Sequence, residues 1–199
     1  ITAWEALVDR ARVQQDQWVL IQGGTGGVGH IAIQLAKAMG AKVAATCGTA
    51  EKCQQASALG ADVVFNYSTT EVQDWLEKLD IKGFDVVFDT AGGESFLTGL
   101  EALRVGGQLV TINARMQYDL AQAHAKGLTV HAVFMLLPLL TGEGRERHAE
   151  ILQGLAELVD EGKLHPLIDD HSYAFEQITE AHQYLESGQV VGKLLLHRH

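Results

Sequence analysis

The chain has 199 residues, of which 47% are hydrophobic and 20% are charged, and its formal net charge is −10 at pH 7. A chain of this length can bury a substantial core, and its acidic balance argues against nucleic acid or an anionic membrane surface as the main partner. No apolar run approaches the roughly 18 residues that a membrane-spanning helix needs, so we expect none. The two cysteines, Cys47 and Cys53, form no Cys-x-x-Cys pair and are typical of a reduced, cytoplasmic protein.

Short apolar strands alternate with helices along the first part of the chain. The apolar pattern predicts strands at residues 18–22, 42–46, 63–65, 84–89 and 107–112. Helical spacing predicts helices at residues 2–8, 28–39, 50–59, 71–79 and 95–103. Strands that are apolar on both faces and alternate with helices indicate a parallel sheet covered on two sides. This is the α/β, doubly wound architecture of the Rossmann fold.

The alternation becomes less regular after residue 114. We expect further elements, a strand at 128–134, helices at 149–158 and 175–185, and a last strand at 193–196. The chain is therefore divided into a dinucleotide-binding domain, residues 1–136, and a C-terminal part, residues 137–199, whose helices and strand complete the sheet. An uncovered apolar edge strand tends to find a partner strand, so residues 128–134 predict a homodimer.

A glycine-rich turn follows the first predicted strand and opens the next helix. Its sequence GTGGVG, residues 24–29, matches the Gly-x-Gly-x-x-Gly pattern of dinucleotide sites. In this pattern Gly24 allows the tight turn, Gly26 lets a pyrophosphate approach the backbone, and Gly29 lets the helix pack close to the sheet. The amides at the helix N-terminus then bind the phosphates. A plain tight turn is the alternative interpretation.

The end of the second predicted strand favours the phosphorylated cofactor. An NAD site places an acid about 20 residues after the glycines, but residues 44–49, AATCGT, contain none. Thr49 instead offers a hydroxyl at a helix start and Lys52 a cation one turn further on, and both suit a 2′-phosphate. Glu51 argues against this, and a capping threonine beside a solvated lysine is the alternative. We predict NADP(H) as the cofactor.

Several ordered motifs resemble the medium-chain dehydrogenase/reductase superfamily. The stretch VLIQGGTGGVG at residues 19–29, preceded by TAWEAL at residues 2–7, is most similar to its quinone oxidoreductase (zeta-crystallin-like) branch. Further landmarks follow in the usual order, namely GAKV from Gly40, LGAD from Leu59, FDTAGG from Phe88, GGQLV from Gly106, GKLHP from Gly162 and GKLLL from Gly192. The likeness covers essentially the whole chain.

The resemblance implies which residues contact the cofactor. The residues that would line the pyrophosphate are Gly26, Gly27 and Val28. The residues that would surround the 2′-phosphate are Thr49, Lys52 and Tyr67. The next contacts would extend from the middle of the cofactor to its nicotinamide end, and they are Thr90, Ala91, Asn113, Phe134 and Met135. Lys193 would approach the cofactor from the tail. The sequence INAR at residues 112–115 departs from the family, in which this strand usually ends in glycine. Packing on a sheet edge is the alternative role for Tyr67.

The resemblance also implies an N-terminal barrel-like substrate domain, for which 199 residues leave no room. We therefore expect a nucleotide-binding domain whose tail returns to the missing domain, and which alone binds NADPH without turning over a substrate. The implied reaction is hydride transfer from the nicotinamide to a quinone, an enone or another activated carbonyl. The alternatives are a zinc-dependent alcohol dehydrogenase of the same superfamily and a non-catalytic NADP(H)-binding module. The sequence identifies no catalytic residue and no metal ligands.

Overall fold

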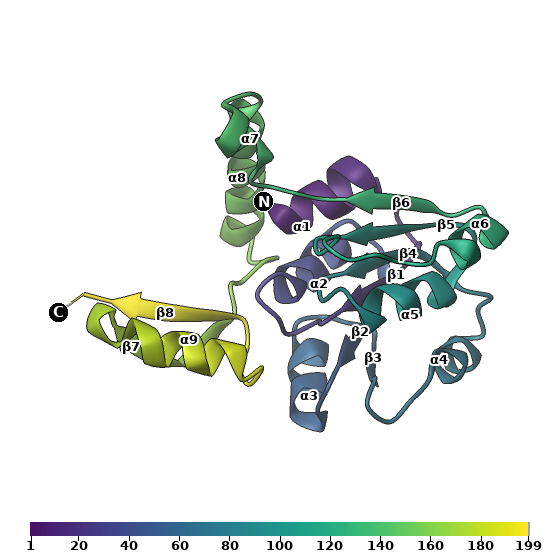
Figure 1. The fold of residues 1–199 in the computed structure, drawn as a ribbon, viewed down its shortest axis with the longest axis horizontal. Coiled ribbons are helices and arrows are strands. Elements are labelled where there is room, and N and C mark those ends of the chain that lie inside the picture. Colours follow the sequence, from purple (N-terminus) through teal and green to yellow (C-terminus); the bar gives the residue numbers. More distant parts are fainter. Residues whose placement is uncertain (199) are drawn as a thin grey trace.

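The computed structural model describes residues 1–198, and its main feature is a parallel sheet of six strands. In chain order these strands are β1 (Trp18–Gln22), β2 (Lys42–Cys47), β3 (Val63–Asn66), β4 (Phe84–Asp89), β5 (Leu103–Thr111) and β6 (Thr129–Ala132). They lie side by side in the order β3-β2-β1-β4-β5-β6 (Figure 1). Every neighbouring pair is parallel, so the carboxyl ends of the strands meet at one edge of the sheet.

Helices cover both faces of this sheet. One core joins it to α1 (Thr2–Trp4), the π-helix η1 (Glu5–Arg10), α2 (Gly29–Ala38) and α3 (Ala50–Ala58). The other core joins it to α4 (Val72–Leu79), α5 (Glu94–Ala102) and α6 (Ala121–Lys126). Val19 and Ile21 belong to the first core, whereas Leu20 between them belongs to the second. Because successive side chains of a strand point to opposite faces, both faces need apolar residues, and this explains the continuous apolar strands.

The strand order reverses beside β1. The chain proceeds from β1 to β2 and β3 on one side, and then returns to place β4, β5 and β6 on the other. The loops after β1 and β4 therefore diverge, and a crevice opens at the carboxyl ends of these two strands. Ligands of doubly wound sheets bind in this crevice.

The C-terminal residues form a second, smaller layer beside the sheet. It comprises α7 (Leu137–Thr141), α8 (Arg145–Asp160), β7 (Ile168–Ala174), the 3₁₀ turn η2 (Phe175–Gln177), α9 (Ile178–Glu186) and β8 (Lys193–His197). The prediction that the last strand completes the main sheet is wrong, because β8 pairs with β7 in a separate two-stranded sheet. Within residues 1–198, β6 takes the position next to β5 that such a strand would need. The boundary proposed at residue 136 stays a prediction.

The elements expected from the sequence are present, but several boundaries differ. The helix expected at residues 149–158 begins at Arg145, the strand expected at 128–134 is limited to Thr129–Ala132, and the helix expected at 2–8 is α1 followed by the π-helix η1. β5 begins at Leu103 rather than at residue 107, because a register shift lets the strand continue through Gly106, whose φ is +70°. Three elements had no sequence signal strong enough to predict them, namely α6, α7 and β7. Of these, β7 (IDDHSYA) is largely polar and exposed, since β8 is the one strand that pairs with it among the described residues. Among the described helices, none combines the length and apolar character needed to cross a membrane.

A buried glutamine on α2 joins the tail to the main sheet. The side-chain amide of Gln34 donates to the carbonyl of His165 over 2.9 Å, and the backbone amide of His165 donates to the Gln34 carbonyl oxygen over 2.7 Å. Further along, the amide of Gly192 donates to the carbonyl of Thr25 over 2.8 Å. The segment before β8 is therefore held against the glycine turn.

We expect Gln34→Leu to loosen the tail without disturbing the sheet, because leucine fills a similar volume but makes neither bond to His165. Losing two neutral hydrogen bonds should accelerate exchange of the His165 amide about tenfold to a hundredfold. Hydrogen exchange followed residue by residue measures this. Gln54→Leu, at an exposed position of α3, is the control and should change nothing. Equal acceleration of amide exchange in β1 and β4 would show that Gln34 stabilises the whole sheet rather than the tail alone.

Candidate functional site: the crevice at the glycine turn

The turn between β1 and α2 depends on glycine at three places. Gly23 has a φ of +71°, a conformation that side chains disfavour, so the tight turn lies at Gly23 rather than at Gly24 as the motif predicted. Gly24 instead packs against β2, since a Cβ there would lie 2.9 Å from the Cβ of Ala45. A Cβ at Gly29 would overlap the carbonyl oxygen of Gly23. The N-terminus of α2 can therefore approach the end of β1 only if residue 29 is glycine.

The two central glycines of the turn have different surroundings. A Cβ at Gly26 would have one close neighbour, the carbonyl oxygen of Gly23 at 3.2 Å. A Cβ at Gly27 would lie 2.9 Å from the ammonium nitrogen of Lys193, which arrives from the tail. The predicted pyrophosphate residues and the predicted tail lysine thus lie together. A positive charge beside a helix N-terminus is well suited to an anionic group.

A cleft of about 420 Å³ opens in front of the turn. Six of the residues predicted to contact the cofactor line it, and they are Gly26, Gly27, Thr49, Lys52, Tyr67 and Thr90. Among its lining residues Lys52 is the one with a charged side chain, and none is acidic. Glu51 does not line this cleft, but it lines an adjacent groove together with Thr49 and Lys52, so its charge stays close to the predicted phosphate site. The tail, through residues such as Leu185 and Gly188, closes one wall, which the sequence did not predict.

The three residues predicted for the 2′-phosphate converge at one end of this cleft. Thr49 caps α3, where its hydroxyl accepts from the Lys52 amide over 3.2 Å. The Lys52 ammonium donates to the carbonyl of Gly188 over 2.6 Å, so it already has a neutral partner in the tail. The Tyr67 hydroxyl lies over Gly48, 2.6 Å from where a Cβ would be. Tyr67 is 59% exposed, which leaves its ring accessible to a ligand.

A buried aspartate organises the loop after β4. Asp89 is fully buried and accepts hydrogen bonds from the amides of Ala91 and Gly92, over 3.1 and 2.8 Å, and from the hydroxyl of Thr111, over 2.8 Å. These bonds join the ends of β4 and β5. The sequence prediction did not include Asp89, although an acid that ends the largely apolar strand FDVVFD is a signal that could have identified it.

The predicted mid-cofactor residues are oriented by this loop. The Thr90 hydroxyl donates to the carbonyl of Gln22 over 2.7 Å, and the Asn113 side-chain amide donates to the carbonyl of Ala91 over 2.9 Å. Ala91 itself borders a neighbouring hollow of about 400 Å³ rather than the main cleft. Asn113 retains a defined orientation although its strand does not end in glycine.

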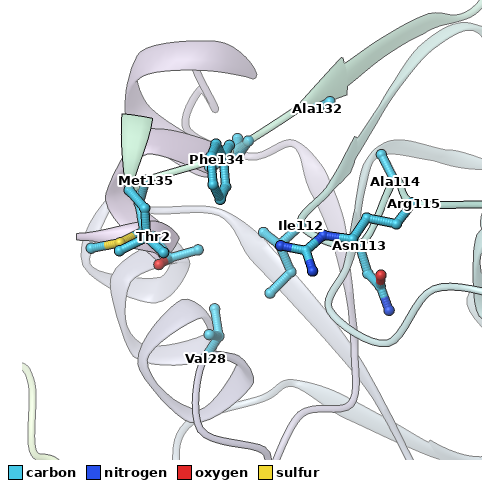
Figure 2. A pocket seen from close by; sticks show the side chains of 11 residues that line it. Thr2, Val28, Ile112, Asn113, Ala114, Arg115, Ala132, Phe134 and Met135 are labelled. Carbon is cyan, nitrogen blue, oxygen red and sulfur yellow. The ribbon is translucent and has the colours of Figure 1, made fainter. Parts of the chain in front are cut away.

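A third pocket, of about 660 Å³, lies beyond the carboxyl ends of β5 and β6. Figure 2 shows the three residues predicted for the nicotinamide side around it, and they are Asn113, Phe134 and Met135. Val28, which was predicted to line the pyrophosphate, lines this pocket instead of the cleft at the turn. Thr2 and Arg115 line the same pocket and were not predicted. Among the lining residues Arg115 carries the one charged side chain, and most of the others are apolar.

Two buried side chains near the turn stay uncharged. His30 on α2 is fully buried, and its Nδ1 donates to the carbonyl of Gly26 over 2.8 Å. Burial, assisted by the charge of Lys193, lowers the pKa of His30, so its imidazole is neutral at pH 7. Burial likewise raises the pKa of the Cys47 thiol to about 11. Neither residue has the properties of a catalytic acid or nucleophile at neutral pH.

No cluster of three or more histidine, cysteine, aspartate or glutamate side chains that could hold a metal ion occurs within residues 1–198. A catalytic zinc ion usually has three protein ligands. The part of the chain that the structure describes therefore does not fit a complete zinc site, and no step of the chemistry is assigned to one here.

The doubly wound sheet and its glycine turn define a dinucleotide-binding domain. A family model described as zinc-binding dehydrogenase matches residues 59–196. The chain belongs to this family of the medium-chain dehydrogenase/reductase superfamily, in its quinone oxidoreductase-like branch.

Relatives and solved structures agree with this assignment. The chain is 33% identical to the mitochondrial NAD(P)H oxidoreductase RTN4IP1 of Danio rerio, and the match covers 98% of this chain and 54% of that protein. An alcohol dehydrogenase superfamily protein from Novosphingobium aromaticivorans superposes with a TM-score of 0.89 at 38% identity, over 96% of this chain and 58% of that one. The Escherichia coli quinone oxidoreductase complexed with NADPH superposes with a TM-score of 0.89 at 30% identity, over 98% of this chain and 61% of that one. The chain thus spans a little over half the length of these proteins.

The two glycines of the turn that differ most in their surroundings should respond differently to an added methyl group. We expect Gly29→Ala to lower the free energy of unfolding by about 1–3 kcal/mol, since its Cβ would overlap the Gly23 carbonyl. Gly26→Ala is the matched control and should cost less, because its Cβ would meet one atom at 3.2 Å. Chemical denaturation of both variants measures the difference. Equal losses of unfolding free energy in the two variants would show that the turn can shift to accommodate a methyl group at residue 29.

Proposed function

We propose that the chain supplies the cofactor site of an NADPH-dependent oxidoreductase that transfers hydride to a quinone, an enone or another activated carbonyl. The observation that carries this proposal is the glycine turn, where Gly26 and Gly27 leave backbone exposed at the mouth of a charged cleft. The kinship with quinone oxidoreductases supports the reaction class. The quinone and enone acceptors, like the activity of the whole protein, belong to this proposal.

The residues around the cleft fit NADP(H). The space left by Gly26 and Gly27, beside the Lys193 ammonium, suits a diphosphate. Thr49, Lys52 and Tyr67 would hold the 2′-phosphate, and the absence of an acid among the residues lining the cleft favours NADPH over NADH. When bound, NADPH supplies a hydride from its nicotinamide ring.

The contribution of the chain itself is to bind and orient. Val28, Phe134 and Met135 provide apolar walls that would hold the ring and exclude water. The acceptor gains one hydride and one proton for each NADPH consumed, and the proton comes from solvent or from a group outside the described residues. Neither His30, which is neutral and buried, nor the protonated Cys47 is assigned to that step.

The experiment that tests this function is an assay of the full-length protein with NADPH and either 1,4-benzoquinone or an aliphatic enone. We expect steady oxidation of NADPH that a zinc chelator does not abolish. Zinc-dependent oxidation of simple alcohols would favour the alcohol dehydrogenase alternative. Tight NADPH binding without turnover of any acceptor would favour a non-catalytic module.

We expect Lys52→Ala to weaken NADPH binding while leaving NADH binding nearly unchanged, because the two cofactors differ only in the 2′-phosphate. A charge-assisted hydrogen bond contributes roughly 1.5–3 kcal/mol, which corresponds to a loss of about tenfold to a hundredfold in affinity. The Lys52 ammonium already contacts the Gly188 carbonyl, so binding a phosphate would weaken or break this hydrogen bond. The loss of NADPH affinity in Lys52→Ala should therefore lie nearer to tenfold than to a hundredfold. Fluorescence titration with both cofactors measures it.

The control for this experiment is Lys82→Ala, since the exposed Lys82 precedes β4 and lies at the opposite edge of the sheet. It should leave both affinities unchanged. The effect of Lys52→Ala should also shrink as salt rises, because the cleft is open to solvent. Equal weakening of NADPH and NADH would assign Lys52 to the fold and remove the main support for NADPH.

We also propose that the protein forms a homodimer through β6. This strand is the last in the sheet, and three of its four residues are exposed. Two apolar residues next to it, Phe134 and Leu136, are exposed as well. A paired edge would satisfy the outer backbone groups of β6 and cover this apolar surface.

A lysine on this edge should weaken the dimer. We expect Val130→Lys to shift the sedimentation coefficient toward the monomer at micromolar protein concentration, because a charge on an edge strand opposes pairing. The same substitution at Val105, which is exposed elsewhere on the sheet, is the control and should leave association unchanged. A wild-type protein that sediments as a monomer at the highest concentrations would rule the dimer out.

A further inference from the structure

Three basic side chains lie at the glycine turn, in the cleft and in the pocket beyond β5 and β6, and two of them have a role in the proposed function. The Lys193 ammonium lies at the glycine turn, where a diphosphate would bind. Lys52 lies at the far end of the cleft with the residues for the 2′-phosphate. These two cations match the anionic groups of NADPH. Arg115 remains, and it lines the separate pocket beyond β5 and β6.

The surroundings of Arg115 make its charge available. Its side chain forms no hydrogen bond or ion pair with any residue of the described chain, 1–198, and it is exposed. In Figure 2 it extends from the loop after β5 toward the open middle of the pocket, on the side opposite Thr2 and Met135. The lining residues include no acid that could neutralise it.

The rest of the pocket has a different chemistry. Val28, Ile112 and Phe134 give it apolar walls, which would accept a flat conjugated body. A guanidinium at the rim of such a pocket binds a carboxylate well, since its planar fork matches the two carboxylate oxygens. The pocket therefore combines space for a conjugated acceptor with one cationic group that can bind an anion.

We propose that Arg115 binds a carboxylate on the acceptor, so that the preferred substrates are enones or quinones carrying a carboxylate near the reacting carbon. This inference rests on the proposed function and narrows its substrate class. Arg115 acts here as a specificity-determining residue that positions the acceptor against the apolar walls. Hydride transfer itself needs no proton from Arg115.

The test compares two acceptors that differ in charge, 4-oxopent-2-enoate and its methyl ester, with the full-length protein and NADPH. We expect kcat/KM for the acid to exceed that for the ester. In Arg115→Gln, kcat/KM for the acid should fall about tenfold to a hundredfold, as expected for a lost charged hydrogen bond, while the ester changes less than about threefold. Arg115→Lys should recover part of the loss, because lysine keeps the charge without the fork.

The control is Arg145→Gln, which removes an exposed arginine at the start of α8 and should affect neither acceptor. Equal losses for the acid and the ester in Arg115→Gln would overturn the proposal and assign Arg115 a general role in the reaction. A weaker affinity for NADPH or a changed ratio of NADPH to NADP⁺ affinity would overturn it too, by placing Arg115 on the cofactor.

A binding measurement separates this proposal from the proposed function. The saturated product 4-oxopentanoate and its methyl ester are titrated by calorimetry into protein saturated with NADP⁺. We expect the acid to bind more tightly than its methyl ester. In Arg115→Gln we expect the two affinities to become equal. If neither acceptor is reduced but the acid still binds through Arg115, the function is wrong and the anion site stands. If turnover is normal but the acid binds no more tightly than its methyl ester, the proposed anion site is wrong.

Discussion

The close contact between α2 and the end of β1 is the constraint on which the site depends. Because residue 29 has no side chain, the first turn of α2 lies directly on the carbonyl of Gly23. This contact directs the helix N-terminus toward the crevice where the strand order reverses, and it leaves room in front of Gly26 and Gly27. Every other part of the candidate site is placed relative to this turn.

Two polar connections extend this arrangement across the molecule. Asp89 joins the ends of β4 and β5 through three hydrogen bonds, and so fixes the loop that carries Thr90 and Ala91. Gln34 holds the tail against α2 through His165, and Lys193, further along the same tail, lies beside Gly27. A buried polar group is costly unless all its bonds are made, so both connections define one arrangement of their neighbours. The crevice is thus enclosed by segments that are far apart in the sequence.

Charge distinguishes the regions of this crevice. The glycine turn and the far end of the cleft each have one lysine, whereas the pocket beyond β5 and β6 has one arginine among largely apolar walls. In an acidic chain, these cations are the charged side chains that an anionic ligand would meet in the cleft, at the turn and in the pocket. A cofactor with anionic groups at one end and a neutral ring at the other fits this order.

The sequence by itself determined the sheet, all of its covering helices except α6, and the location of the turn, because apolar periodicity and glycine spacing are local signals. It also indicated Thr49 and Lys52, which lie within one helical turn. Only the tertiary structure placed the tail: β8 pairs with β7 rather than with the main sheet, and Lys52 contacts Gly188. It alone showed that Arg115 shares a pocket with Phe134. Such contacts join residues far apart in the chain, and their geometry depends on how whole elements pack, which no local pattern encodes.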